Sequence, residues 1–175
     1  MIPFNDRIVG YAAYHKNPKN KFTHLFGVPM VFYSPLIAFN WIRFDLFNIN
    51  MGAGNIILLC IMLWYFSLDK SLATLMTLIS IPVALLMDNL SKLDFQISLT
   101  YFLGLNILGW AIQLLGHYYE GRKPALVDNL VQSLMGPIFV LLEVLFFFGF
   151  KKDLEKEIHD RVEAHPFHNK KTILT

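Results

Sequence analysis

The sequence lacks the features of a secreted, disulfide-stabilised or nucleic-acid-binding protein. Its single cysteine, Cys60, excludes an intramolecular disulfide. The formal net charge of +2 is too small for the basic surface that nucleic-acid binding needs, so no nucleic-acid partner is expected. The N-terminus carries no apolar segment followed by a small-residue cleavage site, so we expect no cleavable signal peptide. No internal repeat or low-complexity block is evident.

Apolar side chains dominate instead: they form 55% of the 175 residues, and aromatic residues form 15%. These shares exceed those of ordinary soluble domains. A run of about 20 apolar residues crosses about 30 Å of hydrocarbon as a helix. We therefore predict an all-α integral membrane protein, a bundle of about four to six apolar helices, surrounded by membrane lipid. The apolar runs cover residues 25–44, 51–66, 72–87, 95–116 and 127–150.

Some of these runs are predicted to be short or broken. The second and third are a few residues short of a full span, and the polar turn between them predicts a helical hairpin. Gly136-Pro137 predicts that the fifth run consists of two half-helices. Residues 1–150 are expected to form a membrane-embedded catalytic domain, and residues 151–175 a charged, initially helical tail.

The segment before the first run predicts a short amphipathic helix at the membrane surface, over residues 5–16. Asn17-Pro18 should end this helix, because the residue before a proline disfavours the α conformation. Asn20 is expected to cap the next helix. Pro35 is expected to kink the first apolar run.

Three histidines stand at the ends of apolar runs. His15 and His24 precede the first run, and His117 ends the fourth. Four runs separate His24 from His117, an even number, so both should emerge on the same side of the membrane. The flanking lysines and arginines place that side in the cytosol. A spacing of nine residues is no standard ligand motif, so hydrogen bonding to headgroups or backbone remains an alternative to metal binding.

Polar residues around His117 could support it chemically. Gln113 lies one turn earlier and could orient the ring, and Glu120 could supply a carboxylate or be an exposed loop charge. Asp128, Asn129 and Gln132 form one polar helix face, which could line an active site or bond neighbouring helices. Glu143 stands in an apolar run and requires a partner or a proton.

Two motifs carry a resemblance to a known family. The first is His15-x-Asn17-Pro18-x-Asn20-x-x-x-His24, followed by Gly27 and Pro29. The second runs from Gln113 to Ser133 and includes Gly116-His117 and Pro124-Ala125-Leu126-Val127-Asp128-Asn129. Both closely resemble motifs of the fungal endoplasmic-reticulum 2-hydroxy fatty acid dioxygenases, over almost all of the chain before the tail. One departure is Lys16, where the fungal enzyme has a further histidine.

The resemblance implies an Fe(II)-dependent dioxygenase that converts a 2-hydroxy fatty acid and O2 into the acid one carbon shorter and CO2. It implies His15, His24 and His117 as catalytic metal ligands. The candidate substrate-binding residues are Lys16, Arg122, Lys123, Asn129 and Gln132, and those that would support the ligands are Asn20, Gln113, Glu120 and Asp128. The expected location is the endoplasmic reticulum of a eukaryote, or the inner membrane of a bacterium, with the active site facing the cytosol.

Other functions remain open from the residues alone. A metal-dependent lipid hydrolase could use zinc at the same histidines. A non-enzymatic small transporter would spread polar groups through the membrane depth, whereas here they gather at one side. A lipid-shaping scaffold would leave the 113–133 motif unexplained.

Overall fold

The computed structural model describes residues 4–46, 48–123 and 130–164. The chain forms two compact units: the first comprises Met1–Val28 and Ala111–Thr175, and the second is Pro29–Trp110. Two long helices, α2 (Pro18–Tyr33) and α6 (Phe95–Glu120), each contribute to both units.

Long apolar helices confirm the predicted all-α membrane protein. Three segments of the described chain are long and apolar enough to cross a membrane, and a bent pair, Val131–Phe147 with Lys152–Glu163, would make a fourth if it formed one span. The three are Pro18–Phe39, Lys70–Ser91 and Phe95–Glu120, of 22, 22 and 26 residues. The second is longer than expected, since 22 residues reach about 33 Å as a helix. The helix α4 (Ala53–Leu68) is shorter.

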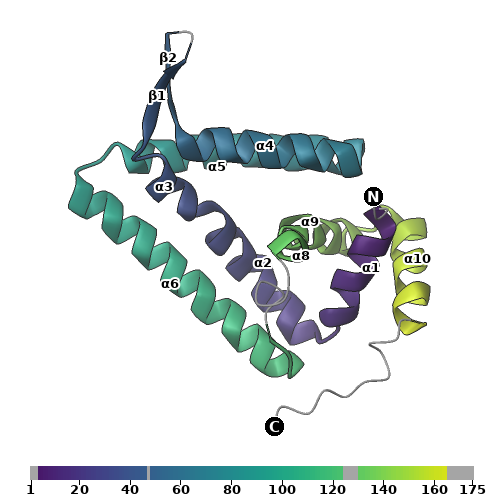
Figure 1. Ribbon diagram of the computed structural model, residues 1–175. Helices are drawn as coiled ribbons and strands as arrows, with labels where there is room; N and C mark the ends of the chain where they lie inside the picture. Colours follow the sequence, from purple (N-terminus) through teal and green to yellow (C-terminus); the bar gives the residue numbers. More distant parts are fainter. Residues whose placement is uncertain (1–3, 47, 124–129, 165–175) are drawn as a thin grey trace. The chain divides into compact units, whose positions relative to one another are not determined.

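The second unit contains the predicted helical hairpin and an unexpected pair of strands. The helices α4 and α5 (Lys70–Ser91) pack side by side (Figure 1). Asp69 is the N-cap of α5, because its side chain accepts a hydrogen bond from Leu72 N at 2.8 Å. The first run is interrupted at Ser34, directly before Pro35, where a kink was predicted, and continues as the short helix α3 (Pro35–Phe39). Its predicted end at Phe44 is wrong, because two strands follow α3. These are β1 (Arg43–Leu46) and β2 (Ile49–Gly52), which pair antiparallel.

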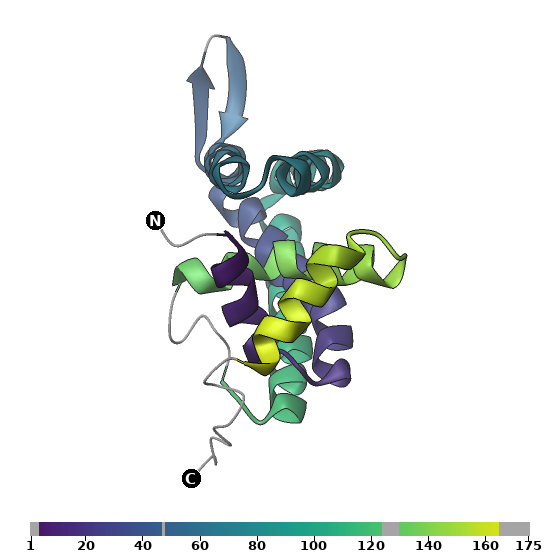
Figure 2. The same cartoon turned by 90° about the vertical axis from the view of Figure 1, so that its right-hand side faces the viewer.

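The first unit contains α1 (Phe4–Tyr14), α8 (Leu130–Ser133), α9 (Met135–Phe147) and α10 (Lys152–Glu163). The apolar face of α1 is buried and packs on α9 and α10, so protein covers the face expected to meet lipid; Figure 2 shows α10 in yellow along α1 in purple. The described part of the tail is the predicted helix, and its Ile158 and Val162 are buried. The residues after Ala164 lie outside the described chain.

The break in the fifth run differs from the prediction by two residues. The helices α8 and α9 meet at Leu134, and Gly136-Pro137 lies in the first turn of α9. Proline is tolerated there because a first-turn N–H has no partner within the helix. The start of this run, with Asp128 and Asn129, lies outside the described residues.

Candidate metal centre

The short connection between α1 and α2 positions the first histidine. His15 directly follows α1, and its backbone N–H still donates to Ala12 O at 3.1 Å. Pro18 then begins α2, and Asn17 caps it by accepting a hydrogen bond from Lys19 N at 2.9 Å. The predicted cap at Asn20 is therefore wrong: a proline fits the first helical position, so the cap is the residue before it.

Glu120, at the end of α6, fastens this connection in place. Its Oε1 accepts from Lys16 N at 3.1 Å. Its Oε2 accepts from Asn17 N at 2.9 Å and from Asn20 Nδ2 at 3.0 Å. Glu120 is therefore not the exposed loop charge that was the alternative, and its carboxylate also lies close enough to His117 to interact with that ring electrostatically. Glu120 instead holds the backbone around His15 against the last turn of α6.

The three predicted histidines lie together. The ring centroids of His15 and His24 are 4.8 Å apart, those of His15 and His117 are 5.3 Å apart, and those of His24 and His117 are 4.9 Å apart. All three residues are buried, with exposed fractions of 1%, 1% and 6%. Burial, followed by the charge of His24, holds the pKa of His15 well below its ordinary value, so the ring is neutral at neutral pH.

Backbone carbonyls fix two of the rings. His15 Nδ1 lies 2.9 Å from Tyr11 O, and His24 Nδ1 lies 3.0 Å from Asn20 O. A carbonyl only accepts, so each Nδ1 carries the ring proton and each Nε2 carries a lone pair. The Tyr11 ring also stacks on His15, with centroids 4.2 Å apart. These contacts set both the orientation and the tautomer of the rings.

One nitrogen on each histidine remains without a protein partner. Within the described chain, His15 Nε2, His24 Nε2 and His117 Nδ1 are buried and make no hydrogen bond. Burying a polar atom without a partner costs about 1–3 kcal/mol, and three such atoms at one place need an explanation. A bound metal ion would satisfy all three.

The arrangement fits a metal ion. One ring nitrogen from each histidine lies within 4.8 Å of the other two, and no other such group of His, Cys, Asp or Glu occurs in residues 4–46, 48–123 and 130–164. Two nitrogens about 2.1 Å from one ion lie at most about 4.2 Å apart, so binding requires only a small contraction. Neutral imidazole suits iron, zinc, copper and nickel.

A glycine allows α6 to approach the cluster. A Cβ atom on Gly116 would lie well under 3.0 Å from Thr23 Oγ1 and Asn20 Oδ1, and 3.3 Å from His24 Nδ1. Gly116 thus permits the close approach of α2 and α6 that brings His117 to the other two histidines. Asn20 supports the cluster through both its backbone oxygen and its side chain.

The residues predicted to bind substrate do not all lie at one place: Lys16 lines a pocket, whereas Arg122 and Gln132 contact the backbone of α1. Lys16 lines a pocket beside His15, and burial lowers its pKa. Arg122 donates to Ala13 O at 3.1 Å, with its guanidinium over the Tyr14 ring, and Gln132 donates to Arg7 O at 3.3 Å.

The hydrogen bonds that Arg122 and Gln132 donate to backbone carbonyls of α1 hold this helix in place. Lys123 is exposed, and Asn129 lies outside the described residues, as does Asp128 among the supporting ones. Gln113 has no hydrogen-bond partner among the described residues, so no contact shows it orienting His117.

Two contributors near the cluster were not among the predicted site residues. Tyr11 supplies the carbonyl and the ring that hold His15, and nothing in its local sequence marks this role. Lys21 forms an ion pair with Glu143 at 2.7 Å. The sequence signal for this pair is the isolated Glu143 in an apolar run, which requires a partner or a proton.

The fold and the site define a small helical membrane protein with a buried cluster of three histidines. Residues 1–148 match the family model described as "Mpo1-like: 2-hydroxy-palmitic acid dioxygenase Mpo1-like", and the chain belongs to this family. It is 35% identical over 167 residues to the Saccharomyces cerevisiae protein named "2-hydroxy-palmitic acid dioxygenase MPO1". The aligned region covers 93% of this chain and 91% of the yeast protein. No solved structure matches the chain.

Proposed function

We propose that this protein is an Fe(II)-dependent 2-hydroxy fatty acid dioxygenase. The reaction is R-CHOH-COOH + O2 → R-COOH + CO2 + H2O, which balances in atoms. The substrate gives up four electrons and O2 accepts four, so no reductase or second cofactor is needed. The yeast relative's name supports the reaction class. The observation that carries the proposal is the set of three buried, unpartnered imidazole nitrogens from His15, His24 and His117.

These three histidines would hold the iron as neutral ligands. Bound Fe(II) would supply the site at which O2 is bound and activated. With three protein ligands, a bound iron would have positions left for oxygen atoms of the substrate and for O2. No other His, Cys, Asp or Glu joins the group within the described chain, so no further side chain of these types would take those positions.

The remaining residues would prepare this site before substrate arrives. Tyr11 O and Asn20 O fix the tautomers of two ligands, so little rearrangement is needed on binding. The burial of the three rings keeps bulk water away from the reacting atoms. Lys16 borders the adjoining pocket and could attract the carboxylate.

The membrane would supply the substrate. His24 and His117 each lie within two turns of one end of a candidate span, Pro18–Phe39 and Phe95–Glu120 respectively. A fatty acid whose chain lies in lipid presents its carboxyl end near such a level. We place the protein in the endoplasmic reticulum of a eukaryote or the inner membrane of a bacterium, with the site on the cytosolic side.

Single replacements of the ligands test the proposal. The wild type and the variants His15→Ala, His24→Ala and His117→Ala are purified, and bound iron and the formation of pentadecanoic acid from 2-hydroxyhexadecanoic acid are measured. We expect each variant to lose both iron and product. His168→Ala, in the tail, is the matched histidine control and should retain both.

Two outcomes contradict the proposal. If the three variants keep iron and activity, the histidines are not the ligands. If the purified wild type binds zinc selectively and hydrolyses a lipid ester without consuming O2, the protein is a metal-dependent hydrolase.

A further inference from the structure

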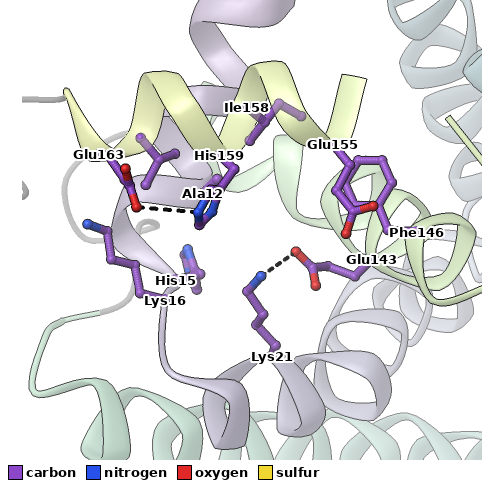
Figure 3. A pocket seen from close by; sticks show the side chains of 11 residues that line it. Ala12, His15, Lys16, Lys21, Glu143, Phe146, Glu155, Ile158, His159 and Glu163 are labelled. Carbon is purple, nitrogen blue, oxygen red and sulfur yellow. Dashed lines mark hydrogen bonds and ion pairs between the residues drawn. The ribbon is translucent and has the colours of Figure 1, made fainter. Parts of the chain in front are cut away.

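A pocket of about 320 Å³ lies beside the histidine cluster, in the first unit of the chain (Figure 3). His15 and Lys21 line it on the side of the cluster, and Glu143 and Phe146 line it from α9. The helix α10 contributes its outer wall. Its volume lies within the range of small-molecule sites.

An ion pair between two helices stands in this pocket. Lys21 Nζ donates to Glu143 Oε1 at 2.7 Å, and the two side chains are 35% and 29% exposed. The same Nζ lies 5.7 Å from the centroid of the Phe139 ring, which itself lies 5.8 Å from the His15 ring. Lys21 and His15, the first of the three histidines, therefore both border the Phe139 ring, and both line this pocket.

The other two acidic residues of the pocket have partners on their own helix. Glu155 pairs with Lys152 at 3.7 Å, and Glu163 pairs with His159 at 3.3 Å. Glu143 differs because it lies on α9 and forms its ion pair with Lys21 on another helix, α2. Figure 3 shows the Lys21–Glu143 and His159–Glu163 pairs as separate dashed contacts.

We infer that Lys21 binds the carboxylate of the substrate and that Glu143 occupies Lys21 until the substrate replaces it. The inference rests on the proposed function, in which the substrate is a 2-hydroxy acid. A carboxylate paired with Lys21 would place the adjoining C2 next to the cluster. Exchange costs little, because an ion pair with side chains about a third exposed contributes only about 0–1 kcal/mol. The released Glu143 carboxylate, 29% exposed, can be solvated in the pocket. A lysine ammonium, with three freely rotating donors, accepts either partner.

This exchange predicts opposite effects for the two residues. Lys21→Met removes the charge that the acid needs, and we expect the affinity for the acid to fall roughly tenfold. Glu143→Gln removes the competing carboxylate, and we expect the affinity for the acid to rise by about threefold. A pair that only fastened α2 to α9 would give no such rise.

The test measures binding under anaerobic conditions, so that no turnover occurs. Iron-loaded full-length protein in lipid nanodiscs is titrated with 2-hydroxyhexadecanoic acid and with hexadecane-1,2-diol, which keeps the hydroxyl and the chain but lacks the carboxylate. The proteins are the wild type, Lys21→Met, Lys21→Arg, Glu143→Gln and Lys19→Met. Lys19 is the matched control, because it is an exposed lysine on the same helix.

We expect Lys21→Met to lose affinity for the acid but not for the diol, with iron content unchanged and with partial recovery in Lys21→Arg. Lys19→Met should behave as the wild type. The inference is overturned if Lys21→Met binds the acid normally, if it weakens acid and diol equally, or if Glu143→Gln weakens binding of the acid. Separately, if the iron-loaded wild type in air fails to convert the acid although Lys21→Met selectively loses its binding, the proposed reaction is wrong while Lys21 still binds the carboxylate.

Discussion

Replacing Gly116 by alanine tests how closely the fold holds the histidine cluster. A Cβ atom there would lie well under 3.0 Å from Thr23 Oγ1 and Asn20 Oδ1, and 3.3 Å from His24 Nδ1. Neither neighbour can turn away freely, because Thr23 Oγ1 donates to Asn20 O at 2.8 Å and the Asn20 side chain is held by its Nδ2, which donates to Glu120 Oε2 at 3.0 Å. The helices α2 and α6 must therefore separate at this point.

The size of the effect follows from the packing. Heavy atoms pack without strain at about 3.5 Å, so α2 and α6 must move apart by roughly 1 Å. Such overpacking costs about 1–3 kcal/mol. If that strain opposes metal binding, the affinity for iron falls roughly 5- to 150-fold, at 1.4 kcal/mol for each factor of ten. His117, which follows Gly116 directly, moves away from the other two histidines.

The assay is a titration of Fe(II) against a competing chelator, with thermal unfolding measured on the same samples. Gly104→Ala is the matched control, since it lies in the same helix and its Cβ would meet no heavy atom within 4 Å among the described residues. We expect Gly104→Ala to bind iron as the wild type does. Equal iron affinity and equal stability in Gly116→Ala would refute the reasoning.

Two further predictions concern groups that hold the fold. Glu120→Gln replaces one carboxylate oxygen by an NH2 group, which cannot accept a hydrogen bond from the backbone N–H of Lys16 or Asn17. We expect thermal unfolding to show a free energy of unfolding lower by about 1–3 kcal/mol. An unchanged unfolding midpoint would contradict the role of Glu120 in holding the connection between α1 and α2. Asp88→Asn weakens the pairing with Arg43 in the second unit, at 3.0 Å, and should lower the midpoint while bound iron per folded protein stays constant; loss of iron at an unchanged midpoint would show a coupling that these contacts do not predict.

The gathering of the three histidines could be predicted because it depends on few assumptions. The even number of predicted apolar runs between His24 and His117 predicts that both emerge on one side of the membrane, and the family resemblance names the partner segments. The structure brings their rings together as that reasoning requires. Their role as metal ligands remains a prediction.

The contacts that hold the cluster could not be predicted from sequence. Glu120 binds residues about a hundred positions away, and nothing local distinguishes a clamp from a solvated loop charge. The pairing of Lys21 with Glu143 spans 122 positions. The sequence indicated that Glu143 needs a partner or a proton, but only the tertiary contact between α2 and α9 shows that a partner is present and that it is Lys21.

The sequence of the strand pair does contain a strand pattern, although the neighbouring apolar runs favoured helices. Apolar and polar residues alternate in Arg43–Leu46 and in Ile49–Gly52, which is the pattern of a hairpin. Asn48, with φ of 62°, lies between them in the left-handed conformation that asparagine tolerates. The predicted helices over residues 25–44 and 51–66 include only the outer two residues of each strand, and the residues between these helices were expected to form a connection.

The stoichiometry of the reaction tests the central claim most directly. Iron-loaded wild-type protein, with no added reductant, is given 2-hydroxyhexadecanoic acid in a sealed cell, and O2 consumed, CO2 released and pentadecanoic acid formed are measured together. We expect one equivalent of each, because the substrate supplies all four electrons. No pentadecanoic acid from a fully iron-loaded sample, or a product formed without O2 uptake, would contradict the account.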